Sequence, residues 1–503
     1  MAIIMKKFLC VIISAVMICG IFTSMPSSVF AAKKKAIRLK KSSATINITL
    51  DNGKQKYGST NIKLKKLKGV KIKKTTYKSS NKDVAKVNKK GKVTAVKKGS
   101  ATVTVKVKYK YKKKTCTKNL KFKVKVKNIS GFLRRLTAFS NKLYNISAKK
   151  GTKNFTMSPV SVYMALSMLY YSGDDNVKND IKELCNMTDS DFSESGNLFK
   201  KLNKQYKDYN GNVAAQLNLT NSIWFDKNET LLPEGLEKLE KELYCDAFST
   251  SFRDNNTAAN KEIREFIKEK TNGLIDRDFN LTPETLMALI NTLYFKDVWA
   301  DGSELDTQKR EFKADGKTKK IDFLEGRYSE GRVQEIDTAE YFYAVTEHGY
   351  KIKFILPKNG CSLSEAMSPE NLNKINNRTD YKFKNGNTEH FTRCIFPSFK
   401  IESETPLKDI LGENGYLKNA FYEFSSPLTE KKLCVSDIKH NTVIDVNKKG
   451  VEGAAVTVIA MKCASALVTT KRVYHDFVLD KNFGFIVTDS SGVILFEGQV
   501  NEP

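Results

Sequence analysis

Residues 445–457 have the sequence Asp-Val-Asn-Lys-Lys-Gly-Val-Glu-Gly-Ala-Ala-Val-Thr, in which small side chains dominate the second half. Side chains of an extended strand point alternately to its two faces. The residues that would share one face are Val451, Gly453, Ala455 and Thr457. None of them is charged or bulky, so the segment can enter the interior of a β-sheet without burying an unpaired charge. A surface loop rich in glycine and alanine is the simpler interpretation of these residues on their own.

Four more stretches precede this one in the chain. They are Asn154-Phe155-Thr156-Met157-Ser158-Pro159-Val160-Ser161-Val162-Tyr163-Met164-Ala165-Leu166, Asn291-Thr292-Leu293-Tyr294-Phe295-Lys296-Asp297-Val298-Trp299, Phe396-Pro397-Ser398-Phe399-Lys400-Ile401-Glu402-Ser403 and Val435-Ser436-Asp437-Ile438-Lys439-His440. Together the five stretches resemble the signatures of the serpin family, in serpin order. The resemblance covers residues 131–503 and implies an α+β serpin fold, with helices around a large mixed sheet A and an exposed reactive loop.

The residue pattern agrees with such a fold. Apolar residues from Phe132 to Leu143 recur at three- and four-residue spacing, which indicates a helix. Further helices are expected at Pro233–Tyr244 and Ala258–Thr271. Strand-like runs come later in the chain, among them Leu286–Phe295 and Phe483–Asp489. Helices first and strands later favour the α+β class.

The resemblance also implies a function. Serpins inhibit serine proteases as suicide substrates: the protease cuts the reactive loop, which then inserts into sheet A. We therefore expect a monomeric inhibitor that traps serine proteases as a covalent acyl complex, without cofactor or metal. Its hinge would consist of Gly450, Val451, Glu452, Gly453, Ala454, Ala455, Val456 and Thr457. Lys448 stands where the family usually carries glutamate.

A second set of residues is expected around the opening of the sheet. By resemblance these are Ser158, Ser161, Asn291 and His440, with Trp299 where the loop enters. Each also has an ordinary structural interpretation. A serine before a proline usually caps a helix, a lone histidine is usually a hydrogen-bonded structural residue, and a tryptophan belongs first of all to the core.

The position of the cleaved bond follows from the length of the hinge. Counting from Gly450 places it at Ala464–Ser465, and a small residue there suits proteases with a shallow primary pocket, as in elastase. Counting back from the strand at Phe483 points instead to Lys471. The alternatives to Ala464 are Met461, Lys462, Lys471 and Arg472.

Two other classes of function compete with inhibition. An enzyme is disfavoured, because no histidine lies in a Gly-x-Ser-x-Gly or His-Glu-x-x-His setting; the histidines are His348, His390, His440 and His475. A non-inhibitory serpin that acts as a surface binding protein is the alternative. The small, uncharged hinge argues against it, since such members usually carry bulky or charged residues there.

Residues 33–128 form a separate, strongly basic module. The chain has 86 Lys and Arg and 55 Asp and Glu, and 34 of the basic residues but only two of the acids lie in this module. Its apolar and polar residues alternate, which predicts short antiparallel strands. The stretch Tyr77–Val87, followed by Gly91–Val96 and Gly99–Val103, resembles the second group of bacterial Ig-like domains. An all-β Ig-like sandwich is therefore expected before the serpin domain at 129–503.

The excess charge predicts a polyanionic partner for the module. Nucleic acid is disfavoured, because exposed aromatics interleaved with its lysines are lacking apart from Tyr109 and Tyr111. An anionic cell-wall or extracellular polymer, bound through residues 33–128, is the expected partner.

The first residues predict export. Lys6 and Lys7 precede an apolar run and the small-residue sequence Val29-Phe30-Ala31, so residues 1–31 are expected to be a signal peptide. The protein should be secreted and extracellular, and the basic module should associate it with the cell surface. No later apolar stretch is long enough to cross a bilayer. Its unpatterned cysteines indicate neither a disulfide framework nor a zinc site.

Overall fold

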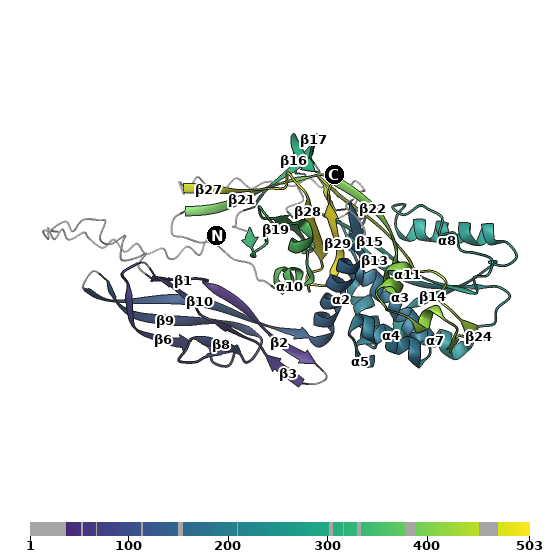
Figure 1. Cartoon of the computed structure of the whole chain (residues 1–503), viewed down its shortest axis with the longest axis horizontal. Helices are drawn as coiled ribbons and strands as arrows, with labels where there is room; N and C mark the ends of the chain where they lie inside the picture. Colours follow the sequence, from purple (N-terminus) through teal and green to yellow (C-terminus); the bar gives the residue numbers. More distant parts are fainter. Residues whose placement is uncertain are drawn as a thin grey trace, which may run out of the picture. The chain divides into compact units, whose positions relative to one another are not determined.

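The computed structural model describes residues 37–51, 54–66, 68–111, 114–148, 154–208, 210–300, 305–314, 316–328, 333–377, 388–451 and 471–503 of the 503-residue chain (Figure 1). The expected signal peptide lies outside these residues. The chain divides into two compact units, one made of the residues up to Ile46 and of Gly58–Val126, the other of Asn47–Tyr57 and Lys127–Pro503.

The N-terminal strands form three sheets. They are β1 (Ile37–Leu39), β2 (Ser43–Asp51), β3 (Lys54–Tyr57), β4 (Ser59–Asn61), β5 (Leu64–Lys66), β6 (Lys71–Ser79), β7 (Ala85–Val87), β8 (Lys92–Ala95), β9 (Gly99–Tyr111) and β10 (Lys114–Ser130). The largest sheet has the order β3-β2-β10-β9-β6, beside a sheet β4-β8-β7 and a pair β1-β5. Val103, Val105 and Val107 of β9 are fully buried, and the residues between them face outward, as their alternation predicts.

The second unit contains helices α2 (Gly131–Ala148), α3 (Pro159–Ser172), α4 (Asp175–Cys185), α5 (Asp189–Phe192), α6 (Ser195–Leu202), α7 (Pro233–Leu243), α8 (Asn256–Lys270), α9 (Leu363–Ala366), α10 (Pro369–Asn377) and α11 (Leu407–Glu413). Its strands are β11 (Phe155–Met157), β12 (Lys204–Lys207), β13 (Val213–Asp226), β14 (Cys245–Thr250), β15 (Met287–Val298), β16 (Asp306–Ala314), β17 (Lys317–Tyr328), β18 (Gln334–Glu335), β19 (Ala339–Val345), β20 (Lys351–Pro357), β21 (Thr388–Pro397), β22 (Phe399–Pro406), β23 (Phe424–Ser426), β24 (Thr429–Leu433), β25 (Lys439–Asn447), β26 (Gly450–Val451), β27 (Lys471–Val478), β28 (Phe483–Thr488) and β29 (Ile494–Val500).

The seven-stranded sheet has the order β12-β13-β15-β26-β25-β22, and β14 joins β13 in parallel. Helices cover both of its faces. Consecutive residues of β15 accordingly pack in two different hydrophobic clusters. Ala288 and Ile290 of β15 pack in the cluster that contains α8. Leu289 and Leu293 pack instead in the main core, which contains α3. The sheet is therefore buried between α8 on one side and the α3 layer on the other (Figure 1).

Two further sheets complete the second unit. A six-stranded sheet has the order β11-β29-β28-β20-β19-β18, and every residue of β28 is buried. A four-stranded sheet has the order β16-β17-β21-β27, in which β27 runs parallel to β21.

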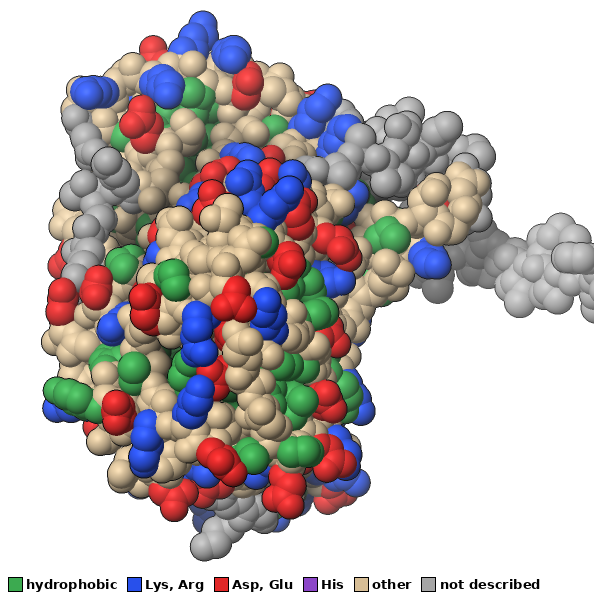
Figure 2. Space-filling view, turned by 90° about the vertical axis from the view of Figure 1, so that its right-hand side faces the viewer, with side chains coloured by type: hydrophobic (Ala, Val, Ile, Leu, Met, Phe, Trp, Pro, Cys, Tyr) green, Lys and Arg blue, Asp and Glu red, His purple; other side chains and the backbone are tan. Residues whose placement is uncertain are grey.

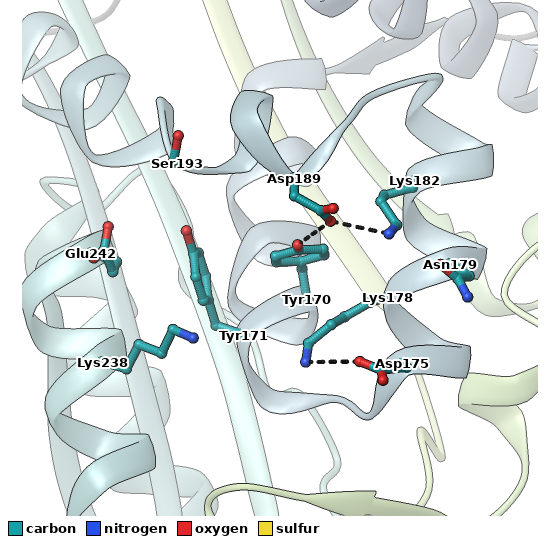
Figure 3. A pocket seen from close by; sticks show the side chains of 10 residues that line it. All are labelled: Tyr170, Tyr171, Asp175, Lys178, Asn179, Lys182, Asp189, Ser193, Lys238 and Glu242. Carbon is teal, nitrogen blue, oxygen red and sulfur yellow. Dashed lines mark hydrogen bonds and ion pairs between the residues drawn. The ribbon is translucent and has the colours of Figure 1, made fainter.

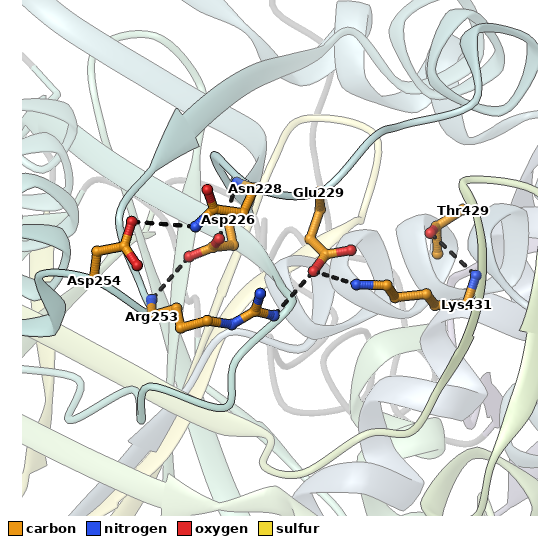
Figure 4. A network of polar contacts seen from close by, with 7 residues as sticks. All are labelled: Asp226, Asn228, Glu229, Arg253, Asp254, Thr429 and Lys431. Atoms are coloured by element: carbon orange, nitrogen blue, oxygen red, sulfur yellow. Dashed lines mark hydrogen bonds and ion pairs between the residues drawn. The ribbon is translucent and has the colours of Figure 1, made fainter.

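A polar network fastens the end of the seven-stranded sheet that lies farthest from β26 (Figure 4). The Glu229 carboxylate accepts hydrogen bonds from the guanidinium of Arg253 at 3.0 Å and from Lys431 Nζ at 2.6 Å. Nearby, Asp226 is fully buried, which alone would raise its pKa. The backbone N–H groups of Arg253 and Asn228 nevertheless hold that pKa below its usual value. The network joins the chain after β13, the chain after β14, and β24.

The second unit lacks the charge excess of the N-terminal module. Residues 129–503 contain 50 basic and 53 acidic residues. Figure 2 shows both kinds of side chain mixed over the face it displays. Within the ranges given above, no helix combines the length and the apolar character that crossing a membrane requires.

One buried carboxylate stands out in the six-stranded sheet. Glu497 of β29 is fully buried, between Met157 of β11 and Ile486 of β28. Neither of its carboxylate oxygens has a hydrogen-bond partner among the described residues. Burial raises the pKa of Glu497 to about 8, although the positive charge of Lys353 limits the rise. The group is therefore protonated at neutral pH in the folded protein.

Glu497→Met should stabilise the protein, and by more as the pH rises. The folded pKa lies above the unfolded value, so the wild type loses stability as the pH rises from about 4.5 to 8, by roughly 4 kcal/mol. The variant lacks this loss. Unfolding midpoints of both proteins between pH 5 and pH 8 measure the difference. Glu497→Gln is the control that keeps a buried polar group but cannot titrate, and a difference that stays constant with pH would contradict the assignment.

Candidate functional site

The predicted hinge begins with a tight turn at the end of β25. Asn447 pairs with Gly450, and its side-chain oxygen accepts the N–H of Lys449 at 3.0 Å, which fixes the turn. The chain then runs back into the seven-stranded sheet as β26. Val451 pairs with Asp297 of β15 on one side and with Val446 of β25 on the other, and is 2% exposed.

β26 separates β15 from β25, and it is short. In the part of the chain that the structure describes, no backbone pair joins β15 directly to β25, and β26 pairs with each over two residues. On its outer edge β15 pairs with β13 over Met287–Lys296. On its outer edge β25 pairs with β22 over Lys439–Val446. Neighbouring strands lie about 4.8 Å apart, so a strand that continued beyond Val451 would find backbone partners on both sides.

Gly450 is required at the start of β26. A Cβ atom on this residue would lie 2.1 Å from the carbonyl oxygen of Asp297 and 2.8 Å from Cα of Val298. Both are backbone atoms, which cannot move without breaking the sheet. The close approach of two backbones therefore excludes any side chain here.

Trp299 holds the turn that leads into β26. Its indole Nε1 donates a hydrogen bond to the carbonyl oxygen of Asn447 at 2.9 Å, and its backbone N–H donates to that of Lys449 at 3.2 Å. The ring is buried against Phe396, with ring centroids 5.8 Å apart. Trp299 thus lies beside the loop entry and apart from the other four predicted residues of the sheet opening.

Those four residues meet at the start of α3. Ser158 is the N-cap of the helix, where its side chain accepts the N–H of Ser161, and Pro159 follows at the first turn. The backbone N–H of Ser158 donates to Nε2 of His440 at 2.9 Å. The hydroxyl of Ser161 bonds Oδ1 of Asn291.

The start of α3 is consequently bonded to strands on both sides of β26. Asn291 belongs to β15, and its amide nitrogen also donates to the carbonyl oxygen of Thr220 on β13 at 3.1 Å. His440 belongs to β25. Any movement that separates β15 from β25 must therefore strain or break one of the bonds made by Ser158 and Ser161.

His440 is neutral in this arrangement. Burial lowers its pKa to about 4. Its Nε2 atom accepts the N–H of Ser158, and that bond requires an unprotonated nitrogen. The imidazole thus holds the helix start only in its neutral form.

A further contact at the loop entry escaped prediction. The side chain of Asp297 is fully buried and bonds Nδ1 of His348 at 2.8 Å and the N–H of the same residue at 3.1 Å. The His348 ring stacks on Tyr206 of β12, with centroids 3.9 Å apart. This contact ties the end of β15 to the turn between β19 and β20. Asp297 and His348 are 51 residues apart, and neither lies in a pattern that would suggest the pairing.

Other predicted positions lie partly outside the described residues. These are the hinge residues Glu452, Gly453, Ala454, Ala455, Val456 and Thr457, the bond Ala464–Ser465, and the alternatives Met461 and Lys462. Lys471 and Arg472 are described as the first residues of β27, opposite Thr388 and Glu389 of β21. No three His, Cys, Asp or Glu side chains of the described chain gather in a way that could hold a metal ion.

A hollow in the second unit lies away from this site. Its volume is 610 Å³, and it is bounded by α3, α4, α5 and α7 (Figure 3). Tyr170 and Tyr171 form one wall, at the C-terminal end of α3, about 18 Å from Ser158. The surrounding lysines are already engaged: Lys178 with Asp175 and Lys182 with Asp189. Lys238, which also lines the hollow, lies over the ring of Tyr171.

Family models match both parts of the chain. Residues 134–503 match the family described as Serpin (serine protease inhibitor), and residues 62–118 match the Bacterial Ig-like domain (group 2). The two predicted resemblances are confirmed.

Individual relatives agree with the family match. Serpin A3-7 of Bos taurus is 29% identical over 385 residues, which cover 73% of this chain and 87% of the relative. The thermophilic serpin tengpin, solved in the native state, has a TM-score of 0.61 at 23% identity and covers 75% of this chain and 96% of that one. Thyroxine-binding globulin in complex with thyroxine has a TM-score of 0.59 at 23% identity, with 74% and 99% covered. The α+β fold predicted for this part of the chain is confirmed.

The neutral form of His440 should make stability depend on pH. Its folded pKa lies below the unfolded value, so stability is complete above about pH 6.5 and falls by roughly 3 kcal/mol as the pH drops toward 4. His440→Gln should remove this part of the loss, as measured by unfolding midpoints from pH 7 to pH 4.5. His475→Gln, which removes an exposed imidazole, is the control and should behave like the wild type. An unchanged acid profile in His440→Gln would refute the neutral assignment.

Proposed function

This chain belongs to the serpin family through residues 134–503, and on that premise we propose that it inhibits serine proteases as a suicide substrate. The protease serine hydroxyl attacks the carbonyl carbon of the reactive bond, and the amide nitrogen leaves with a proton. The carbonyl group of the residue before the cut remains as an ester on the protease serine, and the peptide after the cut is released. Insertion of the freed loop into the sheet then distorts the protease before water can hydrolyse that ester.

The two-residue strand β26 is the observation that carries this proposal. Val451 already occupies the position between β15 and β25, and both neighbouring edges beyond it are unpaired with each other. The residues that follow keep small, uncharged side chains on the face of Val451: Gly453, Ala455 and Thr457. Each backbone hydrogen bond that insertion adds contributes about 1 kcal/mol, so a full strand supplies a large driving force.

A non-inhibitory serpin that acts as a surface binding protein is the alternative. Thyroxine-binding globulin shares the fold and is known in complex with thyroxine. The hinge composition supports inhibition over binding, because a binding protein does not need Gly453 and Ala455 to be small. In either case the chain acts without catalytic turnover.

We propose an elastase-like target, cut at Ala464–Ser465. A small primary residue suits a shallow pocket. A cut at Lys471 or Arg472 is disfavoured, because both residues of β27 are paired with β21 and a protease must accommodate an unpaired, extended chain. Met461 and Lys462 remain as alternatives.

The N-terminal parts of the chain would determine where the inhibitor acts. We propose that residues 1–31 export the protein and that the basic module keeps it at an anionic cell-wall or extracellular polymer, with no role for nucleic acid. The support is the charge: 34 basic and two acidic residues in 33–128, next to a nearly neutral inhibitory part. The protease is then met at the surface by a monomeric inhibitor.

Val451→Arg should convert the inhibitor into a substrate, because an unpaired charge cannot be buried between strands. The number of molecules consumed per protease inhibited should rise roughly tenfold or more. Ala455→Arg places the same charge on the same face beyond β26 and should have the same effect without disturbing the native entry. Glu452→Arg, on the opposite face, is the control and should still inhibit. Stable complexes at the wild-type rate with Ala455→Arg would rule out strand insertion.

The proposed target class has its own test. Elastase should be trapped in a complex that survives denaturing electrophoresis, and mass spectrometry should find a released peptide that begins at Ser465. Ala464→Arg should shift inhibition toward trypsin-like enzymes, whose pocket selects a positive side chain. Trapping of trypsin but not elastase by the wild type, or a different first residue, would contradict the assignment.

A further inference from the structure

One face of the N-terminal module carries a regular array of lysines. On β9 the odd-numbered residues from Ala101 to Tyr109 are buried, so Lys106, Lys108 and Lys110 point outward and are exposed. On β10, Lys121, Lys123 and Lys125 are exposed between buried residues. We call these six residues the lysine face.

The strand register places all six on the same side of the sheet. Lys121 lies opposite Thr104, Lys123 opposite Thr102 and Lys125 opposite Ser100, all even-numbered positions of β9 like its exposed lysines. Along each strand every second residue is a lysine, so successive lysines are about 6.8 Å apart. Neighbouring strands lie about 4.8 Å apart. The result is two rows of three positive charges on neighbouring strands, offset along the strands so that each lysine lies opposite a threonine, serine or asparagine.

The neighbouring strand β6 adds to the repulsion. Lys74 lies directly opposite Lys108, and Lys71 directly opposite Lys110. Like charges in opposite positions destabilise a sheet. Residues 33–128 contain only two acids. The residues that lie opposite the six lysines on β9 and β10 are threonine, serine and asparagine. The module therefore tolerates a repulsion that nothing within this face offsets, which indicates an anionic partner.

The chemistry of the lysine face narrows the partner. A lysine ammonium group is a compact point charge that binds phosphate oxygens, whereas arginine offers a planar fork. The threonine hydroxyls between the lysines can donate further hydrogen bonds. Aromatic rings, on which nucleobases stack, are missing from the described residues of this face.

We propose that the lysine face binds a linear phosphodiester polymer without bases, of the polyol-phosphate type. This rests on the retention proposed for the basic module, and it assigns that retention to one face and one chemistry. A chain with one negative charge per repeat can follow the lysine face along or across the strands. Each lysine–phosphate contact should add about 0.7 to the negative slope of log affinity against log salt, so six contacts give a slope near −4.

The test uses the full-length secreted protein and immobilised poly(glycerol phosphate). The triple variant Lys106→Gln, Lys108→Gln and Lys121→Gln should lose about tenfold or more in affinity and about two units of salt slope. The matched control is Lys86→Gln, Lys89→Gln and Lys92→Gln, which removes the same charge from exposed lysines around β7 and β8. The control should keep nearly wild-type affinity, and both variants should inhibit the target protease normally.

Each other outcome has a defined meaning. Equal losses in both triple variants would overturn the lysine face and leave retention by net charge alone. Equal binding to hyaluronate would overturn the phosphodiester chemistry, and stronger binding to poly-dT would replace it with nucleic acid. If the wild type binds none of these polymers at low salt, the retention proposal itself fails. The protease assay is independent of all four results.

Discussion

The backbone groups on the facing edges of β15 and β25 control the arrangement of the second unit. Buried N–H and carbonyl groups need partners, and here β26 supplies them over only two residues on each side. The bonds from the start of α3 to Asn291 and His440 hold the two strands in place meanwhile. Among the described residues, no strand pairs with these two edges beyond β26.

Local patterns predicted the elements well, and long-range contacts poorly. The strand expected at Leu286–Phe295 is β15, because its alternation records burial on two faces. The helix expected at Ala258–Thr271 begins two residues earlier, because Asn255 caps it by accepting the N–H of Ala258. The meeting of Ser161 with Asn291 was implied by family resemblance alone, since 130 residues separate them. Asp297 and His348 had neither a motif nor a periodicity to connect them.

Charged residues are distributed differently in the two units. In the second unit acids and bases are nearly equal in number, and its ion pairs fasten loops, as Glu229 does with Arg253 and Lys431. In the N-terminal module the alternation that buries Val103, Val105 and Val107 also forces lysines into register on the other side of the sheet. The same period-two pattern therefore specifies both the fold of the module and the surface that it presents.

Under the proposed inhibitory mechanism, the attachment of the α3 start to both β15 and β25 would set how long the uncut protein stays able to inhibit. On that mechanism, insertion of the uncut loop into the sheet would end inhibition, and contacts such as Ser158–His440 oppose it. The rate at which such contacts open rises steeply with temperature, as unfolding rates do, by about 3- to 6-fold per 10 °C. On the proposed mechanism, the protein would keep its inhibitory activity for a shorter time in warm surroundings, and also near pH 4, where His440 gains a proton and the Ser158–His440 bond is lost.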